Sequence, residues 1–91
     1  MRRNETNDKD EAAVTALQAL GWILSDDRRA ERLLAVTGLE PDMLRARAGE
    51  PEMLRAILAF LADHEPDLIA CAEAIGMTPE NIVAARRALA A

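Results

Sequence analysis

One stretch of the chain, residues 51–62 (PEMLRAILAFLA), is apolar around almost its whole circumference when it is drawn as a helix. Only Glu52 and Arg55 carry a charge. A helix on the surface of a globular protein has a polar face opposite its apolar stripe, whereas a helix that is apolar all round is buried on several sides. We therefore predict that a helix at about 51–64 lies at the centre of the fold, with other helices packed against it.

Pairs of proline and an acidic residue mark the start of this helix and of three others. The pairs are Pro41–Asp42, Pro51–Glu52, Pro66–Asp67 and Pro79–Glu80. Proline suits the first helical position because its missing N–H needs no partner there, and the carboxylate that follows complements the helix dipole. Glycines precede three of the prolines by two or three residues, where glycine often ends a helix. These signals predict six short helices at about 11–24, 26–37, 41–48, 51–64, 66–75 and 79–90.

Length and composition favour a single all-α domain. The chain has 91 residues, of which 51% are hydrophobic and only 2% aromatic, so the core must be built mainly from Leu, Ile, Val, Met and Ala. Ala and Leu are strong helix formers, and short links force neighbouring helices to cross steeply or to run antiparallel. We predict a compact orthogonal bundle of five to six helices that occupies residues 10–91. Residues 1–9 are almost entirely polar and are predicted to form a disordered tail.

The spacing of apolar residues predicts which side chains face the core. For the 11–24 helix the predicted stripe is Val14, Leu17, Leu20 or Gly21, and Leu24, with Gly21 as a point of close packing. The 41–48 helix is predicted to bury Met43 and Leu44, and the 66–75 helix Leu68, Ile69, Ala72 and Ile75. The 79–90 helix is predicted to bury Ile82, Val83, Leu89 and either Ala85 or the aliphatic stem of Arg86. We interpret Trp22 as core or boundary packing rather than as a partner-binding aromatic residue.

Few side chains could carry out catalysis or bind a metal. The chain has no glycine-rich phosphate loop, no nucleophile elbow and no paired His and Cys spacing. We interpret His64, which lies among acidic residues, as a histidine at a helix end rather than a metal ligand. Cys71 is interpreted as a small buried residue, and a single thiol fits a reducing compartment. We therefore predict no enzymatic activity, no metal and no cofactor.

No segment has the apolar length expected of a secretory signal or a membrane span. We therefore predict a cytoplasmic protein that makes no contact with a membrane.

Residues 68–89 resemble a DNA-binding helix-turn-helix. In this interpretation Ala72 lets the two helices approach, Gly76 forms the turn and Ile82 packs the second helix. The second helix would contact nucleic acid through Thr78, Asn81, Arg86 and Arg87. However, the net charge is −5, and Glu80 lies at the front of that helix, which disfavours binding to phosphates. A tight helical corner without a DNA-binding role is the alternative explanation.

Arginine outnumbers lysine strongly, since Lys9 is the only lysine. Arginine suits protein interfaces because its planar group pairs with carboxylates through two hydrogen bonds, although such residues also form ion pairs within a bundle. A protein-interaction surface at Arg28, Arg29, Arg45 and Arg47 is predicted on this basis. Our leading hypothesis is a small non-enzymatic adaptor module whose partner is another protein, and the alternative is the nucleic-acid-binding helix-turn-helix at 68–89.

Four sequence segments are similar to those of a known family. They are residues 19–24 (ALGWIL), 32–41 (RLLAVTGLEP), 58–61 (LAFL) and 74–80 (AIGMTPE). The chain resembles the short alphaproteobacterial proteins grouped as domain of unknown function 3572, over about residues 12–90. The resemblance implies a small, helical, cytoplasmic bacterial protein. It supplies no activity, cofactor or site residue.

Overall fold

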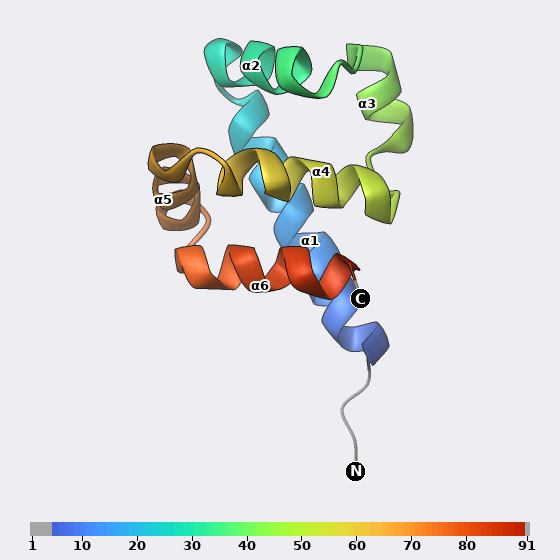
Figure 1. Cartoon of the computed structure of the whole chain (residues 1–91), viewed down its shortest axis with the longest axis vertical. Coiled ribbons are helices and arrows are strands. Elements are labelled where there is room, and N and C mark those ends of the chain that lie inside the picture. Colours follow the sequence, from blue (N-terminus) through green and yellow to red (C-terminus); the bar gives the residue numbers. More distant parts are fainter. Residues whose placement is uncertain (1–4, 91) are drawn as a thin grey trace.

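The structure is a computed structural model that describes residues 5–90, and over this range it consists of six α-helices and no strand. The helices are α1 (Glu5–Leu24), α2 (Asp27–Thr37), α3 (Pro41–Arg47), α4 (Pro51–Ala62), α5 (Glu65–Ala74) and α6 (Pro79–Ala90). Helix α1 is the longest, and both α4 and α6 cross it (Figure 1). The predicted all-α bundle is confirmed, and every predicted boundary after residue 26 is within two residues of the observed one.

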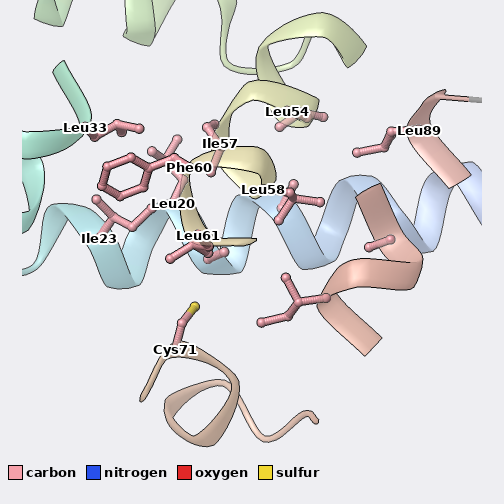
Figure 2. Close-up of a cluster of buried hydrophobic side chains, with 14 of the residues drawn as sticks. Leu20, Ile23, Leu33, Leu54, Ile57, Leu58, Phe60, Leu61, Cys71 and Leu89 are labelled. Carbon is pink, nitrogen blue, oxygen red and sulfur yellow. The ribbon is translucent and has the colours of Figure 1, made fainter. Parts of the chain in front are cut away.

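Helix α4 supplies the largest share of the core. Six of its large side chains are buried, and the helix packs against α1, α2, α5 and α6. In Figure 2 Ile57, Leu58 and Leu61 of α4 lie among side chains that come from those four helices. A helix with neighbours on several sides cannot have a wide polar face. The predicted central helix is therefore confirmed, although it ends at Ala62 rather than at residue 64.

Helix α1 begins earlier than the sequence pattern suggested. It starts at Glu5, so residues 5–9 of the predicted tail are helical, whereas residues 1–4 lie outside the described part of the chain. No proline or glycine interrupts residues 5–20, and Glu and Lys are good helix formers even where nothing packs against them. The absence of apolar residues therefore did not end the helix.

The buried face of α1 also differs from the predicted one. Val14, Leu17 and Leu24 were expected in the core, but they are 54%, 45% and 45% exposed. The buried residues of α1 are instead mostly small: Ala12, Thr15, Ala16, Ala19, Leu20 and Ile23. Small side chains let α4 and α6 approach α1 closely. The closer packing favours burial of this face of α1 over the face that carries the larger residues. Gly21 is exposed, and no atom lies within 4 Å of the position that a Cβ would occupy, so its predicted close-packing role was wrong.

Two further predicted core residues lie at the surface. Met43 of α3 is 43% exposed and Ile69 of α5 is 49% exposed. Helix α5 buries Leu68, Cys71 and Ala72, a spacing of three and four residues that turns Ile69 away from the core. Trp22 is half-buried at the edge of the core, as predicted.

No single helix among the described residues combines the length and the hydropathy of a membrane span. Helices α5 and α6 pass that test only as a pair, and they meet at a bend of 99°.

Candidate functional site

A groove runs between the N-terminal half of α1 and helix α6, where α6 crosses α1 (Figure 1). Its volume is about 760 Å³. The lining residues are Asp8, Asp10, Glu11, Ala12, Val14, Thr15 and Gln18 from α1, Met77 before α6, and Asn81, Ala84, Ala85 and Ala88 from α6. Since Asp10, Val14 and Ala84 are exposed, the groove is open to solvent.

Small side chains form the floor of the groove. Ala12 and Ala85 are buried at its base, and Ala84 and Ala88 continue the same side of α6. Four alanines leave space between two helices that larger residues would have filled. Thr15 is also buried, and its hydroxyl donates a hydrogen bond of 3.8 Å to the Met77 sulfur, which joins the loop before α6 to the floor.

The α1 wall of the groove is acidic. Asp8, Asp10 and Glu11 all line it, whereas no basic residue in the described part of the chain does. The opposite wall is neutral, because α6 contributes alanines and Asn81. Carboxylates along one side of a concave surface give it a negative potential that attracts cations and repels anions.

The link between α5 and α6 has the geometry of a helix-turn-helix corner. Gly76 has a φ of +75°, which glycine adopts without steric cost. The N–H of Met77 donates to the Ala72 carbonyl at 2.8 Å and the N–H of Gly76 to the Glu73 carbonyl at 3.3 Å, the pattern of a Schellman motif. The helices then diverge at 99°, close to the angle in DNA-binding helix-turn-helix motifs.

Thr78 and Asn81, two of the four predicted nucleic-acid contacts, cap the N-terminus of α6. The Thr78 hydroxyl donates to Asn81 Oδ1 at 2.9 Å and accepts from the Asn81 backbone N–H at 3.1 Å, while the Thr78 N–H donates to Asn81 Oδ1 at 3.2 Å. This reciprocal arrangement is a capping box, in which two backbone donors of the first turn are satisfied. Capping therefore explains why Thr78 and Asn81 are present.

Arg86 and Arg87 are exposed, and in the described part of the chain neither forms an ion pair. Asn81, by contrast, lies in the groove opposite the acidic wall of α1. A phosphate backbone that approached Asn81 would face Asp8, Asp10 and Glu11. This charge distribution disfavours nucleic acid at that side of α6.

The structure does not gather the four predicted arginines into one surface. Arg28 and Arg29 begin α2, whereas Arg45 and Arg47 lie in α3 at the other end of the α2–α3 segment (Figure 1). Arg45 Nη1 lies 3.3 Å from Asp42 Oδ1, and Arg47 Nε donates to Glu50 Oε1 at 2.8 Å, which raises the pKa of Arg47. These contacts join residues within or beside α3.

Arg29 has a structural role at the end of α1. Its guanidinium lies 3.7 Å from the centre of the Trp22 ring, and its Nη2 donates to the Trp22 carbonyl at 2.7 Å and to Ser25 Oγ at 3.0 Å. The Arg29 backbone N–H donates to Asp26 Oδ1 at 3.1 Å, and this bond lowers the pKa of Asp26. Arg29 thus adds a third donor to the Trp22 carbonyl, which also accepts from the Ser25 N–H and hydroxyl, while Asp26 caps α2.

His64 and Cys71 lie away from the groove. His64 Nδ1 is 2.9 Å from Asp67 Oδ2, and the same oxygen pairs with Arg32 of α2. Cys71 is fully buried, and burial raises the pKa of its thiol to about 11. Over residues 5–90 no group of three or more His, Cys, Asp or Glu side chains could hold a metal ion.

Sequence reasoning missed the groove because alanines carry no chemical signal of their own. Two patterns could have indicated it. Ala84, Ala85 and Ala88 recur on one side of α6, and the acidic residues of α1 end abruptly where its uncharged segment begins. Only the crossing of the two helices places these patterns together.

Comparison with known proteins adds one assignment. The family model described as "Protein of unknown function (DUF3572)" matches residues 9–91. No curated protein and no solved structure matches the chain. Because the family model covers nearly the whole chain and confirms the resemblance seen in the sequence, the chain belongs to the DUF3572 family of proteins of unknown function.

Proposed function

We propose that this protein is a cytoplasmic, non-enzymatic interaction module whose α1–α6 groove binds a basic amphipathic helix of a partner protein. The observation that carries the proposal is the combination of an apolar, alanine-lined floor with an acidic wall. An amphipathic helix in a groove buries apolar side chains at intervals of three and four residues and keeps its charged face toward the rim. Its lysines or arginines would meet Asp8, Asp10 and Glu11.

The dimensions of the groove support a helix as the occupant. The groove is open along two helices, and a third helix packs between two others at axial distances of about 8–10 Å when the facing side chains are small. The side chains best suited to acid–base or thiol chemistry, His64 and Cys71, lie outside it, which supports binding rather than catalysis.

The test uses two labelled peptides of about 16 residues, long enough to form a helix. Both carry leucine at helical spacing, and their polar faces carry lysine in one peptide and glutamate in the other. Binding is measured by fluorescence anisotropy at about 50 and 200 mM salt. We expect the lysine peptide alone to bind, and to bind more weakly at the higher salt concentration because exposed charge pairs are screened.

Charge reversal assigns the binding to the groove. Asp10→Lys/Glu11→Lys should weaken binding by about fourfold or more, because each attraction of about 0.2 to 1 kcal/mol becomes a repulsion of similar size. Glu31→Lys/Glu73→Lys makes the same change in net charge at exposed positions outside the groove, and binding should change by no more than about twofold. Equal losses in the two variants would show that only overall charge matters, and failure of the lysine peptide to bind would refute the groove as a helix site.

Nucleic-acid binding is the second candidate, and the 99° corner between α5 and α6 is the observation that favours it. The same assay with a labelled DNA duplex tests it. Because the acidic wall faces Asn81, we expect no binding at about 200 mM salt. Duplex binding that is lost in Arg86→Glu/Arg87→Glu would replace the proposed function with the helix-turn-helix interpretation.

A further inference from the structure

The outer face of α1 carries an apolar stripe that no other part of the described chain covers. Val14, Leu17 and Leu24 are 54%, 45% and 45% exposed, and Gly21 lies between the last two. We call these four residues the α1 stripe. Leu17, Gly21 and Leu24 do not line the groove, and only Val14 borders both surfaces.

The spacing of the α1 stripe is that of a helix-pairing seam. Residues 14, 17, 21 and 24 follow intervals of three, four and three, which are the a and d positions of a heptad. Residues 12–24 contain no charged side chain, and the cores of protein interfaces are depleted of charge. Nothing lies within 4 Å of the site where Gly21 would carry a Cβ, so the stripe has an open hole for a side chain of a facing helix.

A second copy of this chain complements the stripe best when the two α1 helices run antiparallel. In that arrangement an a position faces a d position, so Val14 of one copy faces Leu24 of the other, and Leu17 enters the hole above Gly21. Both facing pairs recur by two-fold symmetry, so the stripe is complementary to itself.

The charge distribution of α1 favours antiparallel over parallel pairing of the two helices. Residues 5–11 contain four acidic residues and one lysine, so parallel pairing would place two acidic segments together. Antiparallel pairing separates them. We propose that two copies of this protein pair as a two-fold symmetric, antiparallel dimer through the α1 stripe. Such a pair uses the same surface on both subunits, as most homodimers do.

Sedimentation equilibrium over about 5 to 500 µM protein measures the association in the micromolar range. We expect the wild-type chain to dimerise and Leu17→Glu to stay monomeric, because the substitution puts a charge into each half of the interface. Ile69→Glu introduces the same charge at an equally exposed site on α5 and should leave the dimer unchanged. A wild-type chain that is monomeric throughout, or equal effects of the two substitutions, would overturn the proposal.

Cysteine cross-linking tests the direction. Under oxidising conditions, mixed Val14→Cys and Leu24→Cys chains should form the heterodimeric disulfide, whereas Val14→Cys alone should not cross-link. Cross-linking of Val14→Cys with itself would show parallel pairing and overturn the model of an antiparallel dimer. Leu17 and Leu24 lie outside the groove, so failure here leaves the groove proposal intact.

Discussion

Replacing Ile57 with alanine should destabilise the domain severely, because this side chain lies at the centre of the core. Ile57 belongs to α4 and is 1% exposed. Its neighbours in Figure 2 come from several helices, so no single helix can move to fill the space that the substitution leaves. The substitution to alanine keeps the helix, since alanine is the best helix former.

The magnitude follows from the atoms that are removed. Three carbons leave the core, and at about 0.8 kcal/mol each their transfer from water is worth about 2.4 kcal/mol. The unfilled cavity adds to this, so we expect a total loss of about 3–4 kcal/mol, within the range for buried Ile→Ala substitutions. A chain of 91 residues has a free energy of unfolding of about 5–13 kcal/mol, so the loss is a quarter or more of the total. The melting temperature should fall by about 4–8 °C for each kcal/mol.

Ile69→Ala is the matched control, because the same three carbons are removed from a residue that is 49% exposed. Half of the side chain is already in water, and alanine gains a few tenths of a kcal/mol in helix propensity, so the expected loss is about 1 kcal/mol or less. Urea and thermal unfolding followed by far-UV circular dichroism compare the two variants. Equal losses would refute the assignment of Ile69 to the surface, and a loss below about 1 kcal/mol for Ile57→Ala would refute the central position of α4.

Two further perturbations test the turn before α6 and the buried thiol. Gly76→Ala should cost about 1–2 kcal/mol in a urea melt because φ at Gly76 is +75°, whereas Gly49→Ala, where φ is not positive, should cost less; equal costs would contradict the left-handed turn. Burial raises the pKa of Cys71 from 9.0 to about 11, so the stability that depends on the neutral thiol is fully present below pH 9 and lost as pH rises toward 11. Between pH 8 and 10 the free energy of unfolding of wild type should therefore fall by roughly 1 kcal/mol more than that of Cys71→Ala, and parallel pH profiles would exclude this coupling.

Helix boundaries were predictable from the sequence because local chemistry sets them. A proline at the first helical position and an acidic residue after it act on their own backbone, so no knowledge of the tertiary fold is needed. Observed starts at Pro41, Pro51 and Pro79 agree with this. The burial of α4 was predictable for a related reason, since a helix that is apolar all round has no polar face to turn toward water.

The buried face of α1 was not predictable in the same way. Residues 12–24 are uncharged, so hydropathy allows more than one side of the helix to face the core. A hydropathy pattern that gives most weight to large side chains predicts that Val14, Leu17 and Leu24 are buried. In the structure the buried face is instead rich in alanine, which lets two other helices come close. That choice depends on the distances between helices, which a hydropathy pattern does not contain.

The arginines that were predicted to form one interaction surface do not lie together, for a similar reason. Arg29 follows Trp22 by seven residues, across a turn that reverses the chain direction, and the turn brings the guanidinium onto the ring and the Trp22 carbonyl. Its sequence neighbour Arg28 remains exposed. A count of arginines cannot distinguish the two, because the difference is made by the path of the backbone through residues 25 and 26.

The exposed apolar residues of this chain fall into two groups with different meanings. Val36, Met43 and Ile69 lie singly on α2, α3 and α5, and isolated residues of this kind are ordinary on protein surfaces. Val14, Leu17 and Leu24, in contrast, follow a heptad along one face of a single helix. The fold does not require that face to be apolar, because the opposite side of α1 already supplies the contacts with α4 and α6. An apolar outer face on a helix that is already packed costs solubility unless another surface covers it, and the proposed pairing of two copies would cover this face.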